Sequence, residues 1–201
     1  MKKLALRAIS IVGLTCAVNA LADDGNWYIA GGLGGTDVSA LIFDTQNAMI
    51  SKGATRFSYA ANQGIAASRL QAGYMFLPHW AVEAGFVNLG DFKYTASGGN
   101  LAAPVSLSSH IKATYVDAVA ILPFTDHAGF FAKLGLAHTT STGVTALPLA
   151  FAGTSVNGLT GGLGLKYEFS NGVSIQYEQD SYNVHASSVI GVGTFNLGYR
   201  F

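Results

Sequence analysis

The chain has 201 residues, of which 50% are hydrophobic and only 11% charged, with 25 glycines and one cysteine. A single cysteine excludes a disulfide framework and a cysteine-based zinc site. Equal numbers of basic and acidic residues exclude the strongly basic surface of a nucleic-acid-binding protein. The length is that of one domain, and the composition favours a domain that meets an apolar environment.

The first residues have the pattern of a secretory signal peptide. Lys2, Lys3 and Arg7 form a basic start, residues 8–18 are almost wholly apolar, and 20–22 read Ala-Leu-Ala, a small-x-small cleavage site. The apolar run is shorter than the roughly 20 residues that span a bilayer. We therefore expect residues 1–22 to be a cleaved signal peptide and residues 23–201 to be the mature domain.

Beyond residue 22, no stretch approaches the length of apolar chain that a membrane helix needs. Instead, eight segments alternate between apolar and polar or small side chains. A period of two places alternate side chains on opposite faces, so each segment is predicted to be a strand. The segments are 27–33, 69–76, 82–86, 115–122, 130–136, 159–167, 173–178 and 194–201.

The connections between these segments alternate in length. Those around 77–79, 123–126 and 170–172 are tight, whereas those around 36–63, 90–108, 140–155 and 182–189 are longer. Short periplasmic turns and long extracellular loops are typical of outer-membrane barrels. Closure is required, because an open strand edge in hydrocarbon leaves backbone groups unpaired. The sequence thus predicts an all-β fold for residues 23–201, an outer-membrane β-barrel domain with eight strands in an antiparallel up-and-down transmembrane β-barrel.

A soluble, lipocalin-like barrel is the alternative, and it would place apolar side chains inside and charges outside. The polar face here carries too much glycine to coat a soluble protein. The apolar face carries aromatic residues that suit a girdle at a membrane interface, namely Tyr74, Phe76, Trp80, Tyr167, Phe169, Tyr177, Tyr199 and Phe201. We expect the protein to lie in the cell outer membrane of a Gram-negative bacterium. Its expected partners are outer-membrane lipid and lipopolysaccharide, and it is not expected to bind nucleic acid.

Short fragments along the mature chain resemble a known family. They are Gly73-Tyr74 through Pro78, residues 82–86 (Val-Glu-Ala-Gly-Phe), 123–126 (Pro-Phe-Thr-Asp), 133–135 (Lys-Leu-Gly), 161–163 (Gly-Gly-Leu) and 197–201 (Leu-Gly-Tyr-Arg-Phe). In this order and spacing they resemble the transmembrane domain of outer membrane protein A and its short OmpA/OmpX-like relatives. The chain ends at Phe201, so the resemblance implies a barrel without the periplasmic peptidoglycan-binding domain.

The resemblance also implies two sets of functional residues. The barrel-insertion machinery reads a terminal phenylalanine preceded by alternating aromatic or apolar residues, a pattern matched by Phe195, Leu197, Tyr199 and Phe201. The family's lumen holds a charged cluster that blocks or gates it. Glu83 matches the glutamate of that cluster and Lys133 falls where the family has an arginine. Other cluster positions fall on Val119, Lys166 and Ser174, so the charges are arranged differently.

Alternation alone places six ionisable side chains in the lumen. They are Arg69, Glu83, Asp117, Lys133, Lys166 and Glu178. Three basic and three acidic groups balance, which favours a paired plug in a barrel too narrow to be an open channel. A narrow gated pore along the same residues is the alternative.

Neither metal binding nor catalysis is favoured by the polar residues. The five histidines, at 79, 110, 127, 138 and 185, lack the spacing of metal ligands. A barrel enzyme acting on lipid A would need a nucleophile beside a base. His138 with Thr139 or Thr140, and His185 with Ser187, are candidates, but no carboxylate stands near to orient either histidine. We expect no enzyme activity, no cofactor, no metal and no catalytic residue.

The loops at 36–63 and 140–155 are long for an eight-stranded barrel. The first carries Leu41, Ile42, Phe43, Phe57 and Tyr59, and the second carries an apolar run at 146–151. Apolar residues at loop tips either bind an extracellular partner or pack on one another. Both interpretations stay open, and the predicted function is a structural or adhesin-like surface-interaction role.

Overall fold

The structure is a computed structural model that describes residues 26–59, 65–145, 154–184 and 189–201. The predicted signal peptide, residues 1–22, lies outside the described residues. So do residues 60–64, 146–153 and 185–188, which belong to three of the predicted loops and include His185 and Ser187. No helix in the described part of the chain is long and apolar enough to cross a membrane.

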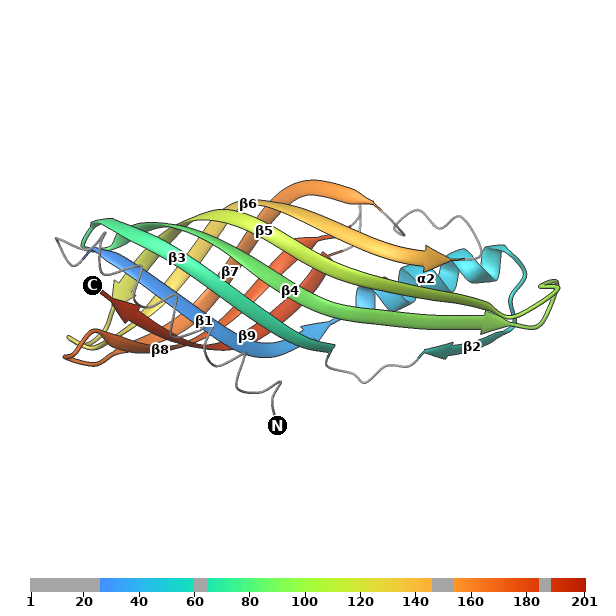
Figure 1. Cartoon of the computed structure of the whole chain (residues 1–201), viewed down its shortest axis with the longest axis horizontal. Coiled ribbons are helices and arrows are strands. Elements are labelled where there is room, and N and C mark those ends of the chain that lie inside the picture. Colours follow the sequence, from blue (N-terminus) through green and yellow to red (C-terminus); the bar gives the residue numbers. More distant parts are fainter. Residues whose placement is uncertain (1–25, 60–64, 146–153, 185–188) are drawn as a thin grey trace, which may run out of the picture.

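Eight long strands form a closed antiparallel barrel, as the alternation predicts (Figure 1). They are β1 (Trp27–Asp37), β3 (Ile65–Leu77), β4 (Trp80–Ser97), β5 (Val105–Pro123), β6 (Ala128–Thr145), β7 (Ser155–Glu168), β8 (Val173–Asn183) and β9 (Val189–Arg200). The barrel closes where β1 pairs with β9, from Tyr28↔Arg200 to Asp37↔Gly191. Every strand of the barrel therefore has a neighbour on both sides, which satisfies the backbone within hydrocarbon.

The two faces of the strands differ in the predicted sense. Along β6, Phe130, Leu134 and Leu136 face outward and are exposed, whereas Phe131 and Lys133 face inward and are buried. The same alternation holds along the lower parts of the other strands, which are the parts nearer the tight turns. The outward side chains form an apolar band, which is the surface that lipid contacts in a transmembrane barrel.

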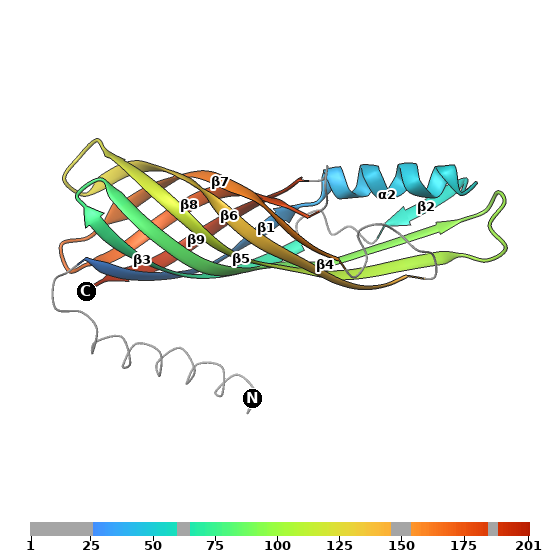
Figure 2. The same cartoon turned by 90° about the horizontal axis from the view of Figure 1, so that it is seen from above.

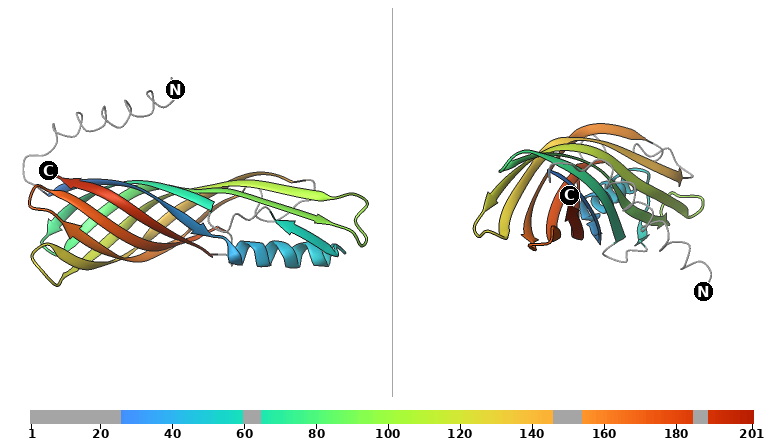
Figure 3. Two further views of the ribbon diagram at one scale, coloured as in Figure 1. Left: turned by 90° about the horizontal axis from the view of Figure 1, so that it is seen from below. Right: turned by 60° about the vertical axis from the view of Figure 1, so that its left-hand side comes forward.

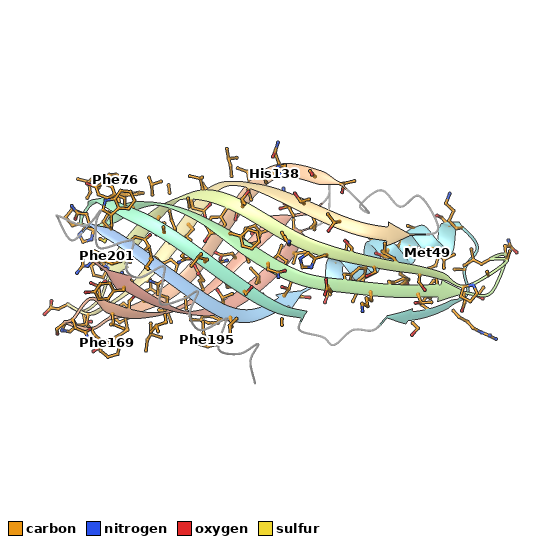
Figure 4. All side chains as sticks on the ribbon, viewed as in Figure 1. Met49, Phe76, His138, Phe169, Phe195 and Phe201 are labelled. Atoms are coloured by element: carbon orange, nitrogen blue, oxygen red, sulfur yellow. The ribbon has the colours of Figure 1, made fainter. Side chains whose placement is uncertain are left out.

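Aromatic side chains mark one end of this band. Phe76, Phe169 and Phe201 lie at the end that carries the three tight turns, far from Met49 at the opposite end (Figure 4). Outward rings there touch in pairs, with centroids 4.9 Å apart for Trp27–Tyr74 and 5.0 Å apart for Tyr199–Phe201. Such a girdle is typical of the interface between lipid and water, and tight turns at this end are typical of the periplasmic side of an outer-membrane barrel.

The prediction of a long loop at 90–108 is wrong. β4 continues to Ser97, β5 begins at Val105, and only residues 98–104 connect them. β4, β5 and β6 have 18, 19 and 18 residues, whereas about 9–11 residues cross a bilayer. The upper parts of these strands, which are the parts far from the tight turns, therefore project beyond the rest of the barrel, to the right in Figure 2.

The long predicted loop at 36–63 also contains regular structure. Helix α2 (Ser39–Ser51) follows β1, and strand β2 (Arg56–Tyr59) pairs with the upper part of β4. We call the head the unit formed by α2, β2 and residues 89–97, 105–113 and 137–145 of β4, β5 and β6. Figure 3 shows α2 lying along the projecting strands, and β2 lies beside β4 at the end of the strand order.

A β-bulge in β4 separates the head from the membrane part. Asn88 pairs with Lys112 and Gly90 pairs with Ile111, so Leu89 is an extra residue. Gly90 has φ of 89°, which favours glycine, and its N–H donates to Asn88 Oδ1 at 3.0 Å. Below the bulge the odd-numbered residues face inward, and above it the even-numbered ones do. The bulge thus turns Phe92, Tyr94 and Ala96 into the interior of the head.

Candidate functional site

Five charged side chains from four strands meet in the lumen. Arg69 on β3 forms ion pairs with Glu178 (Nη1 to Oε1, 2.5 Å) and with Asp180, both on β8. Lys133 on β6 forms ion pairs with Glu83 on β4 (Nζ to Oε1, 2.5 Å) and with Glu178. None of the five is more than 5% exposed. We call this group the ion network.

Neutral side chains complete the ion network. The bonds are those from Tyr28 Oη to Glu83 Oε2 (3.0 Å), from Tyr115 Oη to Glu83 Oε1 (3.3 Å), from Asn196 Nδ2 to Glu178 Oε1 (2.6 Å), and from Arg69 Nη2 to Tyr182 Oη (3.0 Å). Side chains from seven of the eight barrel strands therefore contribute. Buried charges are tolerated when they are paired and hydrogen-bonded in this way.

Glycines on the inner wall make room for the tyrosine rings. A Cβ atom on Gly73 would lie 2.2 Å from Cζ of Tyr28, and one on Gly85 would lie 2.5 Å from Cζ of Tyr115. Both distances are far below van der Waals contact. The abundance of glycine on the polar face therefore has a packing reason: each of these two glycines accepts the ring of a tyrosine that bonds to the ion network.

Asp117, a sixth lumenal group, is buried but stands apart from the ion pairs. It lies on β5 and is only 2% exposed. Among the described residues no basic side chain forms an ion pair with it, and its Oδ1 has no hydrogen-bond partner. The sequence places this side chain on the inner face, but it does not reveal that the expected pairing with a cation is missing.

Lys166 lies away from the ion network, at the periplasmic mouth. Its Nζ is 2.7 Å from Oε2 of Glu168, which also forms an ion pair with Arg200. A small hollow separates Lys166 from the network and is lined by Tyr28, Glu83, Val119, Ile121, Phe131, Lys133, Lys166 and Gln176. The sequence-predicted set of six therefore divides into four network residues, the isolated Asp117 and the rim residue Lys166.

Asp180 belongs to the ion network but was not predicted from the sequence. The predicted alternation of the seventh segment stops at Glu178, because Gln179 lies on what should be an apolar face. β8 continues to Asn183, and Asp180 is buried beside Arg69. Extending the same period by two residues would have found it. The described lumen thus holds two basic network residues, Arg69 and Lys133, against four carboxylates.

A second layer, apolar rather than charged, fills the barrel above the ion network. Its members are buried hydrophobic side chains of the head and the upper strands, among them Leu41, Met49, Leu89, Phe92, Tyr94, Leu107, Ile111, Tyr182, Ile190 and Val192. α2 contributes Leu41 and Met49 from one face, while Phe43 and Ile50 on other faces remain exposed. Tyr115 and Tyr182, with ring centroids 6.0 Å apart, lie where the two layers meet.

The candidate catalytic histidine is held in a polar contact on the outer surface. His138 Nδ1 lies 2.6 Å from Asn157 Oδ1 on the neighbouring strand β7. Thr139 faces the interior and is buried, so His138 and Thr139 lie on opposite faces of β6. Within the described ranges, no group of three or more histidine, cysteine, aspartate or glutamate residues is placed to hold a metal ion.

The residues of the predicted insertion signal lie on the last strand and beside it. Phe195, Leu197 and Tyr199 face outward from β9 and are exposed, with Phe195 in ring contact with Tyr177 at 4.8 Å. Phe201 follows β9, and its N–H donates to the carbonyl of Trp27 at 2.9 Å. The recognition of these four side chains by the insertion machinery stays a prediction.

Comparison with known proteins supports the architecture. A family model for the outer membrane protein beta-barrel domain matches residues 8–201. No curated protein matches the chain. Among solved structures, Ail, the attachment invasion locus protein of Yersinia pestis, is similar with a TM-score of 0.52 and 14% identity, covering 89% of this chain and 99% of that one.

Two further solved structures have the same fold. OprG, an outer membrane protein of Pseudomonas aeruginosa, has a TM-score of 0.52 and 15% identity, covering 90% of this chain and 97% of that one. Ail of Yersinia pestis in complex with the heparin analogue sucrose octasulfate has a TM-score of 0.51 and 13% identity, covering 88% and 98%. At sequence identities this low, the similarity shows only a shared fold.

Proposed function

Because the chain belongs to the outer membrane protein beta-barrel family, and so lies in the Gram-negative outer membrane, we propose that it is a sealed barrel whose head makes adhesin-like surface contacts. The head carries this proposal: its strands extend beyond the apolar band and enclose an apolar interior closed by α2. Strands that served only to cross the bilayer would end at its surface.

The closure of the lumen is the first support for a role other than conduction. The ion network brings buried side chains of non-adjacent strands into direct contact across the lumen. Above it, the interior of the head is lined by apolar side chains, and an apolar constriction of this kind excludes water and ions. An ion would have to pass both layers in series. A gated pore is therefore the disfavoured alternative.

Planar-bilayer recording tests the closure. We expect purified protein to show no discrete openings, either as the wild type or as Glu83→Ala, because the apolar layer remains in the variant. Openings of the wild type would contradict the sealed barrel. Openings of Glu83→Ala alone would show that the ion network is the whole barrier and that a gated pore is the better function.

A surface role is the second part of the proposal. Ail, which shares the fold, is by name an attachment protein. In this chain, the head is the surface that we propose makes comparable contacts. The test is attachment to cultured epithelial cells by a non-adherent Gram-negative host that displays the full chain. More attachment than with the empty host supports the role, and no increase contradicts it.

The same proposal covers export, membrane contacts and the absence of catalysis. We propose that residues 1–22 are removed, that the apolar band contacts outer-membrane lipid and lipopolysaccharide, and that the barrel performs no chemistry on them. Amino-terminal sequencing of the membrane-inserted protein should begin at Asp23. Mass spectrometry of lipid A from the same cells should match that of the empty host, and a modified lipid A would establish an enzyme instead.

A further inference from the structure

The head contains one strand that is paired along a single edge. β2 pairs with β4, from Arg56↔Ser97 to Tyr59↔Tyr94. Across the described residues, β2 stands at the end of the strand order and no strand pairs with its other edge. Backbone N–H and C=O groups on such an edge are available to a further strand, which is a common way of binding extended peptides.

The edge lies outside the membrane and is left open by α2. β2 pairs with β4 well above the bulge at Leu89, whereas the apolar band covers the part of β4 below it. α2 turns Leu41, Thr45 and Met49 into the interior of the head, so it covers the inner face of the sheet. A helix satisfies its own backbone and forms no ladder with a strand. Figures 2 and 3 show α2 running alongside the sheet.

The surroundings of the edge are basic. Lys52 precedes β2, Arg56 begins it, and Lys93 lies on β4 just below the segment that pairs with β2; all three are exposed. In the described part of the chain, none of the three forms an ion pair. Asp91 contacts His110 on β5 instead, with its Oδ1 2.7 Å from Nδ1 of that histidine. Charge complementarity therefore favours an acidic partner.

The inner face of β2 supplies an apolar contact. Phe57 is partly buried against the head interior, with its ring centroid 6.3 Å from that of Tyr94. A strand added beside β2 would place alternate side chains next to Phe57 and the others on the outer face near Arg56. The fitting segment thus alternates apolar residues with acidic ones.

We propose that the free edge of β2 binds an extended polypeptide of alternating acidic and apolar residues as an added strand of the head. The inference rests on the proposed surface-contact function and names the partner class for it. A strand of four residues forms too few backbone hydrogen bonds to hold a neutral peptide, so the three basic side chains set the selectivity.

The test measures binding of a fluorescent peptide of alternating valine and glutamate to the full chain in detergent, by anisotropy. We expect binding by the wild type and a loss of about tenfold or more in affinity for the double variant Arg56→Glu with Lys93→Glu. Lys112→Glu, an exposed lysine on the outer face of β5, is the matched control and should bind as the wild type does. Equal losses for both variants would contradict the site.

A second peptide separates strand addition from simple charge attraction. Replacing its valines by prolines keeps the charge and removes the N–H groups that a strand needs, so this peptide should bind at least about tenfold more weakly. Equal binding of both peptides, or displacement by a sulfated oligosaccharide at matched charge, would show a polyanion site and overturn the proposal. If Arg56→Glu with Lys93→Glu still promotes cell attachment, the edge is refuted while the surface role stands.

Discussion

Glu83 and Asp117 are register partners on β4 and β5, so two buried carboxylates lie side by side in the lumen. Glu83 has Lys133 as an ion-pair partner, whereas Asp117 has none among the described residues. Like charges directly opposite each other in a sheet are destabilising. We expect Asp117→Asn to raise the free energy of unfolding by about 1 kcal/mol, as measured by urea titration in lipid vesicles.

The matched variant at the neighbouring position should behave in the opposite way. Glu83→Gln removes a partner of Lys133 and should lower the free energy of unfolding, because it breaks a buried pair. Equal destabilisation by Asp117→Asn and Glu83→Gln would mean that Asp117 is as fully stabilised as Glu83.

Lys133 is the cation between two carboxylates, and its loss should be the most damaging single change in the ion network. Lys133→Met leaves Glu83 and Glu178 buried without this partner, which should cost about 3–5 kcal/mol of unfolding free energy. Lys166→Met at the periplasmic mouth is the control and should cost about 1 kcal/mol or less, because its pair is nearer solvent. Similar losses of unfolding free energy for Lys133→Met and Lys166→Met would contradict a stabilising role of the ion network.

Gly85 should tolerate no side chain while the ring of Tyr115 lies over it. A Cβ at Gly85 would approach Tyr115 Oη to 2.5 Å, whereas a Cβ at Gly161 would meet nothing nearer than 3.4 Å. Gly85→Ala should therefore destabilise the barrel by about 1–3 kcal/mol, while Gly161→Ala stays near the wild type. Both are compared by urea titration in vesicles. A neutral Gly85→Ala would show that Tyr115 moves freely from this glycine.

The head should unfold locally when its interior is damaged. Met49 is fully buried, whereas Ile50, the next residue of α2, is exposed. Met49→Ala should cost about 2–5 kcal/mol of local stability, seen as faster cleavage of the head by protease added to intact cells. Ile50→Ala should be cleaved like the wild type. Unchanged cleavage of Met49→Ala would mean that α2 is not held by the interior of the head.

The sequence predicts the membrane part of the fold well, because the physical rule there is simple. A strand between lipid and a polar lumen must alternate, and the alternation ends where tight turns such as Asn171-Gly172 begin. The inward direction of Arg69, Glu83, Lys133 and Glu178 follows from the same period. Which of them pair does not follow, since contacts across the lumen join strands far apart in sequence.

The head escaped prediction for two reasons. Its strands carry Ser, Thr and Gly on the outer face, as in Ser106 and Ser108, so they resemble loops in composition. The extra residue Leu89 also breaks the period of two within β4. One signal was available: Leu41, Thr45 and Met49 recur every four residues, which is the spacing of a helix with one buried face.

The bulge at Leu89 separates two parts of the protein that are stable in different surroundings. Below it, the apolar side chains point outward and reach their lowest free energy only in lipid. Above it, they point inward, as in a water-soluble protein, and need no bilayer to hide them. We therefore expect that during biogenesis the head can fold in water, whereas the barrel below it folds only in the membrane.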